Sequence, residues 1–187
     1  MDIFMRKNLF IWQFAGITFT TVLGTVLHFL YNWIPCPIIA SFSAINESTW
    51  EHMKLLFFPM LTFAGIQYYF FRKDAKDAPN FWQIKCAGIL TGLILIPSLF
   101  YTLNGIFGKT PDWLNILTFF IAVFIAYYVE YKLFENHSLS AVPKIWAIII
   151  LAFIALSFIL YTFAPPQIPL FQDPITGKYG IIKINEP

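Results

Sequence analysis

Five long apolar segments, separated by short polar connections, dominate the pattern of residues along this chain. They cover residues 9–34, 54–71, 82–104, 111–131 and 144–164. Because an α-helix rises about 1.5 Å per residue, about 20 residues are enough to cross a hydrocarbon core about 30 Å thick. The pattern predicts an all-α membrane protein, a bundle of five transmembrane helices that passes several times through the cell membrane.

The composition agrees with a chain whose main partner is the lipid bilayer. Of its 187 residues, 58% are hydrophobic and 12% are charged, whereas soluble domains carry about 25% charged residues. The net charge is +2 and no basic run occurs, so nothing favours a nucleic-acid-binding surface. We expect one transmembrane domain over 1–164, followed by a proline-rich tail over 165–187.

The positive charges predict an orientation for the bundle. Arg6 and Lys7 precede the first apolar segment. A larger basic group separates the second and third segments, formed by Arg72, Lys73, Lys76 and Lys85. Since basic residues favour the cytoplasmic side of short loops, the N-terminus is predicted inside. Five crossings then place the C-terminal tail outside.

Small and polar residues follow two stripes along the first apolar segment. One face carries Thr18, Thr21, Thr25, His28 and Asn32, and a second carries Gly16, Thr20 and Gly24. The second stripe is typical of helices that approach closely in membranes, as is Gly88-x-x-x-Gly92 in the third segment. Helix packing is the simpler interpretation of both stripes. The functional alternative is a polar path that ends at His28.

A compact polar cluster over residues 43–54 lies between the first and second apolar segments. Ser48-x-x-Glu51 has the spacing of a capping box, in which the Ser48 oxygen accepts from the Glu51 amide and the Glu51 side chain reaches back to the Ser48 amide. Asn46 offers an alternative cap one turn earlier. Capping alone does not account for Trp50, His52 or the entry of Lys54 into an apolar segment.

The same cluster also suggests a binding site near the outer face of the membrane. If a helix begins near residue 46, Glu47 and Glu51 share one face, and His28 approaches from the same leaflet. A divalent metal could be held by His28, Glu47, Glu51 and His52. Without a metal, these groups could act as an acid–base pair. The spacing Glu-x-x-x-Glu-His is not an established zinc motif, unlike His-Glu-x-x-His.

The tail contains turn signals but also several apolar residues. Asp173-Pro-x-Thr-Gly177 predicts tight turns, and apolar residues such as Phe171 are unusual in a disordered segment. We expect the tail to fold back over the outer face as a lid, which would bring Asp173 near the polar cluster. The candidate ligand-binding residues are therefore His28, Asn46, Glu47, Trp50, Glu51, His52 and Asp173.

Three other reactive or ionisable side chains are predicted to be structural. Cys36 and Cys86 fall at opposite faces of the predicted bundle, and no C-x-x-C spacing favours zinc or a redox pair. Glu130 lies near the inner end of the fourth segment, shortly before Lys132. We expect Glu130 at the membrane interface, in a structural ion pair rather than in a proton relay.

Two sequence motifs make this chain resemble a known family of proteins. Asn46-Glu-Ser-Thr-Trp-Glu-His-Met-Lys54, together with Pro-Leu-Phe-x-Asp-Pro-x-Thr-Gly in the tail, resembles a family of small bacterial integral membrane proteins of unknown function. The resemblance implies a membrane location and a bacterial, Gram-positive origin, and it implies no activity, cofactor or catalytic residue. The chain does not resemble the seven-helix metal-dependent lipid hydrolases in helix count or in their Ser/Asp/His arrangement.

Three functions remain open at this stage. The first is binding or transport of a small ligand or ion in an outward-facing polar pocket, for which five helices would need to form homo-oligomers or join other membrane subunits. The second is a membrane-embedded, metal-dependent hydrolase or transferase acting on a lipid or envelope substrate. The third is an accessory membrane subunit without a site. No nucleophile signature accompanies the polar cluster, so catalytic residues stay unknown.

Overall fold

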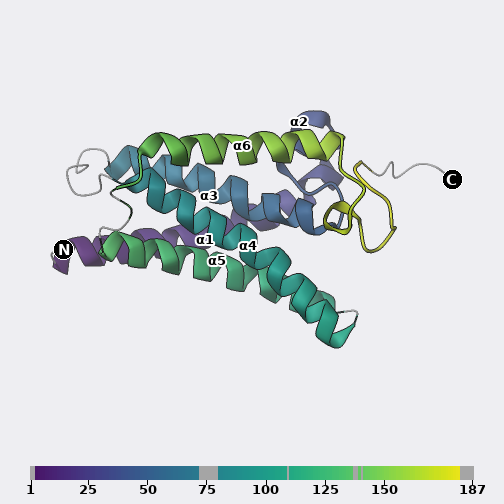
Figure 1. The fold of residues 1–187 in the computed structure, drawn as a ribbon, viewed down its shortest axis with the longest axis horizontal. Helices are drawn as coiled ribbons and strands as arrows, with labels where there is room; N and C mark the ends of the chain where they lie inside the picture. The colour runs from purple at the N-terminus through teal and green to yellow at the C-terminus, as the bar shows by residue number, and fades with distance from the viewer. Residues whose placement is uncertain (1–2, 72–79, 109, 137–138, 140, 182–187) are drawn as a thin grey trace.

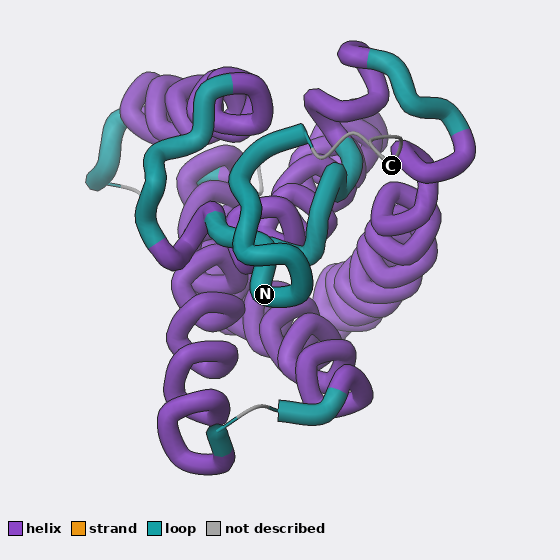
Figure 2. Tube along the Cα trace, turned by 90° about the vertical axis from the view of Figure 1, so that its right-hand side faces the viewer, coloured by secondary structure: helices purple, strands orange, loops and turns teal. Residues whose placement is uncertain are grey.

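A computed structural model describes residues 3–71, 80–108, 110–136, 139 and 141–181 of the chain. Six α-helices follow one another in these residues: α1 (Ile3–Trp33), α2 (Pro37–Phe42), α3 (Thr49–Phe71), α4 (Phe81–Phe107), α5 (Asp112–Glu135) and α6 (Lys144–Phe163). A short 3-10 helix, η2 (Pro169–Phe171), follows them. The described part of the chain contains no strand (Figure 2). The all-α class predicted from the sequence is confirmed.

Each predicted apolar segment corresponds to one long helix, and α2 is an addition to the prediction. No helix was predicted from the sequence for residues 37–42. Pro37 instead occupies the first helical turn of α2, where its fixed φ and its missing N–H are tolerated. The two cysteines, Cys36 before α2 and Cys86 in α4, are both free.

Four of the described helices are long and apolar enough to cross a membrane. These spans are Asn8–Trp33, Phe81–Phe107, Trp113–Glu135 and Lys144–Phe163. The fifth predicted span corresponds to α3, which is long but less apolar because it contains Lys54, Gln67 and two tyrosines. The four spans indicate a membrane protein, and the place of α3 in the bundle explains why it differs.

Helix α3 is the most enclosed long helix of the bundle. It packs against α1, α4 and α6, and Figure 1 shows it beside α6 in the bundle. Its buried side chains include Leu56, Phe57 and Met60, which lie in the main hydrophobic core. Since its neighbours separate much of α3 from the surroundings, it can carry polar groups that a lipid-facing helix would exclude.

The small-residue stripe of α1 packs against α3 and α5. A Cβ placed on Gly24 would overlap the Leu55 carbonyl oxygen, and one placed on Gly16 would overlap the Tyr127 ring. Between them, the Thr20 hydroxyl hydrogen-bonds the Tyr127 hydroxyl over 2.9 Å. Helix packing is therefore confirmed as a role of this stripe, because glycine allows the backbones to approach closely.

The structure corrects the places expected for Lys85 and Glu130. Lys85 was counted among the basic residues of a cytoplasmic connection, and Glu130 was expected at the interface near Lys132. Both are fully buried, and they form an ion pair between α4 and α5. Lys132 pairs instead with Glu135. The basic residues Arg72, Lys73 and Lys76 lie outside the described residues.

The segment after α6 contacts the beginning of α3. The Phe171 ring lies 4.6 Å from the Trp50 ring, and the Asn46 side chain donates a hydrogen bond to the Gly180 carbonyl over 2.9 Å. Figure 1 shows this segment and α2 at the end of the bundle opposite the start of α1. The polar cluster of residues 43–54 lies at the same end as this segment, because the two are in contact.

Candidate functional site

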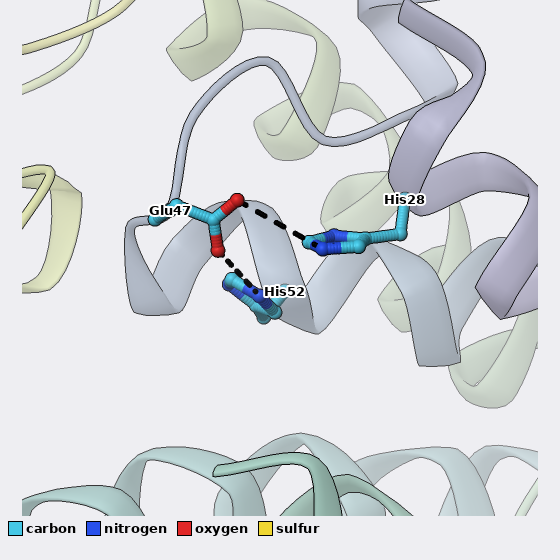
Figure 3. Close-up of side chains that lie close together, drawn as sticks. All are labelled: His28, Glu47 and His52. Atoms are coloured by element: carbon cyan, nitrogen blue, oxygen red, sulfur yellow. Dashed lines mark ion pairs between the residues drawn. The ribbon is translucent and has the colours of Figure 1, made fainter. Parts of the chain in front are cut away.

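Three of the predicted site residues come together from three separate segments. His28 lies near the end of α1, Glu47 in the connection between α2 and α3, and His52 in the first turn of α3. Figure 3 shows the Glu47 carboxylate pointing toward both imidazole rings. We refer to these three residues as the His28–Glu47–His52 cluster.

The imidazole nitrogens and the carboxylate oxygens of this cluster lie close to one another. Glu47 Oε1 lies 3.8 Å from His28 Nε2, and Glu47 Oε2 lies 3.4 Å from His52 Nε2. One ligand atom from each residue falls within 4.8 Å of the other two. Tetrahedral zinc with ligands at about 2.0–2.1 Å separates them by roughly 3.3 Å, so small side-chain shifts would close the cluster around an ion.

The hydrogen bond made by the other nitrogen of His52 determines what Nε2 can do. His52 Nδ1 lies 2.9 Å from the Ser48 carbonyl oxygen. Because a carbonyl oxygen only accepts, Nδ1 carries the hydrogen. In the neutral ring, Nε2 then presents a lone pair toward the Glu47 carboxylate, so that a metal ion between them would suit both groups. When the ring is protonated, Nε2 carries a hydrogen and donates it to Glu47. A metal-binding histidine is commonly oriented by such a hydrogen bond from its second nitrogen.

His28 approaches the cluster from the side of α1. Its ring centroid lies 5.2 Å from that of His52 and 4.8 Å from that of Phe29. Its Nδ1 is buried without a hydrogen-bond partner among the described residues. Nε2 therefore faces Glu47 while Nδ1 is enclosed, so the ring has one nitrogen available to a ligand in this arrangement.

The cluster is partly open, as a site that exchanges its ligand requires. The exposed fractions of the side chains are 25% for His28, 32% for His52 and 43% for Glu47. Hydrogen bonding to His52 is the largest influence on Glu47 and lowers the pKa of its carboxyl, although partial burial opposes the shift. The charge of a protonated His28 acts in the same direction as His52. Glu47 is therefore held as a carboxylate, the form that binds metal.

The connection that carries Glu47 is shaped by side chains on either side of it. The Ser48 hydroxyl accepts a hydrogen bond from the Glu51 amide over 3.4 Å, which is the first half of the predicted capping box. The second half differs, since the Ser48 amide donates to Asn46 Oδ1 over 2.9 Å. Asn46 thus holds the turn that presents Glu47, and its Nδ2 binds the Gly180 carbonyl.

Glu51, a predicted metal ligand, is engaged elsewhere. Its carboxylate is almost fully buried, accepts from the Ile45 amide over 3.1 Å and lies 2.6 Å from Lys54 Nζ. The Lys54 ammonium also donates to the Ala40 carbonyl and to the Thr162 hydroxyl. Each hydrogen of the ammonium therefore has an acceptor, and the pair fastens the start of α3 to α2 and α6.

The remaining two predicted residues lie outside the His28–Glu47–His52 cluster. Trp50 packs against Phe158 of α6 and Phe171 of the final segment, with ring centroids 4.6 Å apart in both cases. The Asp173 carboxylate accepts from the Ile175 amide and from the Thr176 hydroxyl, as expected for a tight turn. Asp173 stabilises its own turn, and Trp50 joins α3 to this segment.

Sequence reasoning did not identify the residues that support the site. The anchoring role of Lys54 depends on Ala40 and Thr162, which are distant in the sequence. The sequence did contain one indication of this role, namely Lys54, because an isolated charge in an apolar segment needs a buried partner. Glu51, three residues earlier, was that partner.

Comparison with known proteins identifies a family for the chain but no activity. The chain matches a family described as a family of unknown function (DUF6512) over residues 1–181. No curated protein and no solved structure matches the chain. The geometry of the cluster must therefore carry the functional argument.

Proposed function

The chain belongs to DUF6512, a family of unknown function, and from this premise we propose that it is an integral membrane protein that binds a divalent transition metal ion. The ligands are His28, Glu47 and His52. The observation that carries the proposal is the approach of their three ligand atoms to within 4.8 Å of one another. Each comes from a different segment, so helix capping by the polar cluster does not account for their meeting.

The chemistry of the three side chains suits zinc or a similar ion. Two imidazole nitrogens and one carboxylate oxygen form a common set of three protein ligands for zinc, with a fourth position open to water or substrate. Imidazole ligands also select against magnesium and calcium, which prefer oxygen. The hydrogen bond from His52 Nδ1 to the Ser48 carbonyl supports the same assignment, because it directs Nε2 toward Glu47.

The proposed arrangement in the membrane has five crossings, by α1, α3, α4, α5 and α6. Basic residues such as Arg6 and Lys7 place the start of α1 on the cytoplasmic side. The metal site then faces outward, at the opposite end of the bundle. The segment over 165–181 acts there as a lid over the connection that carries Glu47, held by Phe171 on Trp50 and by Asn46 on Gly180.

The primary role that we propose is ion binding or transport at this outward site. The half-exposed Glu47 side chain gives an ion access to the cluster, while the buried Glu51–Lys54 pair holds the framework in place. Metal affinity would depend on pH, because both histidines must be neutral to bind. Ion capture from the outer face is the function that this geometry supports best.

A metal-dependent hydrolase or transferase acting on a lipid substrate is the second candidate. It is favoured by the open fourth position and by the surroundings of His28, where the exposed side chains of Phe29 and Trp33 lie next to one another. In a bilayer these rings would meet lipid near the headgroups. A bound metal would supply Lewis-acid chemistry at a position that a headgroup could reach.

The test is metal binding by the purified full-length protein. Wild type, stripped with chelator and dialysed against Zn²⁺, should retain about one ion per chain, measured by elemental analysis. His28→Ala, His52→Ala and Glu47→Gln should each lose it, while Glu135→Gln, a carboxylate change elsewhere, should not. Absence of metal from wild type, or its retention in both histidine variants, would leave an accessory subunit with a capped helix as the better account.

A further inference from the structure

A second group of polar side chains lies near the other end of the bundle, where α1 begins. It consists of Gln13 of α1, Gln67 of α3, Lys85 of α4 and Glu130 of α5. Each is less than 5% exposed. Four polar side chains from four helices are therefore enclosed within segments that otherwise pack apolar residues, and such groups in membrane helices are typical of functional sites.

The contacts within this group centre on Glu130. Its Oε2 pairs with Lys85 Nζ over 2.5 Å. Gln13 approaches the same carboxylate, but in a geometry that makes no hydrogen bond. Gln67 lies one turn along α3 from Phe63, whose ring is 5.9 Å from Lys85 Nζ. Gln13 of α1 thus lies beside the ion pair of α4 and α5, and Gln67 lies one turn of α3 from a ring that faces Lys85.

The buried Glu51–Lys54 ion pair provides a comparison for the hydrogen bonds of Lys85. Lys54 Nζ has three acceptors, namely Glu51, the Ala40 carbonyl and the Thr162 hydroxyl. Lys85 Nζ has Glu130 as its acceptor and no second one in the part of the chain that the structure describes. The Glu51–Lys54 pair is complete in itself, whereas the Lys85–Glu130 pair leaves hydrogen-bonding capacity unused.

Five further buried atoms, on three of the same four helices, lack hydrogen-bond partners among the described residues. They are both polar atoms of the Gln13 side chain, both of the Gln67 side chain, and Glu130 Oε1. A buried polar atom without a hydrogen bond costs free energy, so a group of them requires an explanation such as bound water. Donors and acceptors are both present, which is what a buried water needs in order to make its two to four hydrogen bonds.

Lys85 is placed so that it can remain charged if Glu130 becomes neutral. Its ammonium is surrounded by aromatic rings with centroids 5.4–5.9 Å from Nζ: Phe63, Phe81, Tyr127 and Phe134. The electron-rich faces of aromatic rings attract a cation, and more strongly away from water. The fixed positive charge also makes the group unsuitable for a metal ion, so a proton is the cation that fits.

We propose that Glu130 is a proton-binding site that takes up and releases a proton through water held by Gln13 and Gln67. In uptake, a hydronium ion transfers its proton to Glu130 Oε1, leaving a water molecule and a neutral carboxylic acid beside the Lys85 ammonium. Release reverses the step. Lys85 from α4 is the charged group that faces Glu130, Tyr127 lies one turn away on α5, and α1 and α3 present uncharged amides.

Infrared difference spectroscopy of the full-length protein in lipid vesicles tests the proposal. On acidification, wild type should gain the C=O band of a buried protonated carboxylic acid, and this band should shift in D₂O because water reaches it. Glu130→Gln should lack the band, and Glu135→Gln should retain it. Since Glu130→Gln leaves Lys85 unpaired, Lys85→Met/Glu130→Gln serves as a second variant, without either charge.

The two glutamines provide a readout that separates a proton site from a structural ion pair. Gln13→Leu and Gln67→Leu should together slow the deuterium shift of the Glu130 band, although both remove unpartnered buried atoms and should not weaken the fold. Identical difference spectra for wild type and Glu130→Gln would overturn the proposal. An unchanged rate of deuterium exchange in the double leucine variant would overturn the part assigned to water.

Discussion

The imidazole rings of His28 and His52 lie 5.2 Å apart across the contact between α1 and α3. Glu47 reaches both rings from the connection between α2 and α3, at 3.8 and 3.4 Å. The connection is held in position by the buried Glu51–Lys54 pair, since Glu51 accepts a hydrogen bond from the Ile45 amide of the connection. The predictions below separate the residues that would bind metal from those that hold them in place.

Replacement of Glu51 should affect stability and leave metal binding intact. Glu51→Gln leaves the Lys54 ammonium buried without its carboxylate, and breaking such a pair from one side costs about 3–5 kcal/mol. The cluster of His28, Glu47 and His52 does not include Glu51. We expect a lower midpoint of thermal unfolding, with one zinc ion still bound to the folded fraction in elemental analysis.

The matched control for Glu51→Gln removes both charges together. Glu51→Gln/Lys54→Met should be more stable than Glu51→Gln alone, because no buried charge is left uncompensated. Loss of metal from a folded Glu51→Gln variant would contradict the arrangement described for the site and would restore Glu51 as a ligand.

Acidification of the metal-free protein should weaken the fold through Glu47. The pKa of its carboxyl is lowered in the folded protein, mainly by hydrogen bonding to His52. Its stabilising contribution is therefore fully present above the unfolded value of about 4.3, and it is lost as the pH falls through the lowered folded value. The free energy of unfolding of Glu47→Gln should not show this loss at acidic pH. Identical pH dependences of unfolding for wild type and Glu47→Gln would refute the prediction.

Glycine positions in α1 and α4 should differ sharply in their tolerance of a methyl group. Gly24→Ala places a Cβ against the Leu55 carbonyl oxygen, and such overpacking costs about 1–3 kcal/mol. Gly105→Ala meets no atom within 4 Å and should stabilise slightly, because alanine favours a helix over glycine by about 0.5–1 kcal/mol. Denaturant unfolding in detergent compares the two, and equal stabilities would argue against the close contact of α1 with α3.

The proposed lid should matter for metal retention through Phe171. This side chain is 5% exposed and packs on Trp50, two residues before His52. Phe171→Ala should lower stability by about 3–5 kcal/mol and speed the release of zinc to a chelator. Ile175→Ala, at a position 76% exposed in the same segment, should do neither. Equal release rates for the two variants would remove the lid from the account.

The apolar pattern predicted the positions of the five long helices, because the length of an apolar helix is a local property of the sequence, and four of them are apolar enough to cross a membrane. Within them, the Gly16 and Gly24 stripe was correctly read as a packing surface. The burial of Lys85 was not foreseen, since its partner Glu130 lies on another helix and Lys85 was grouped with the basic residues that precede the third apolar segment.

The candidate site could be predicted in part, for similar physical reasons. His28, Glu47 and His52 were singled out because polar residues near an interface are few, and the structure brings these three together. Glu51 belonged to the same sequence cluster, but its direction depends on Lys54 and the Ile45 amide. Contacts between Trp50 and Phe171 join distant parts of the chain, and a helical pattern contains no information about them.

X-ray absorption at the zinc edge of the loaded full-length protein tests the central claim most directly. The account predicts nitrogen and oxygen ligands at about 2.0–2.1 Å, with the outer-shell scattering of two imidazole rings. His52→Ala should reduce that scattering to one ring or abolish binding. A first shell that contains sulfur, or one made of oxygen alone without imidazole scattering, would contradict a site formed by His28, Glu47 and His52.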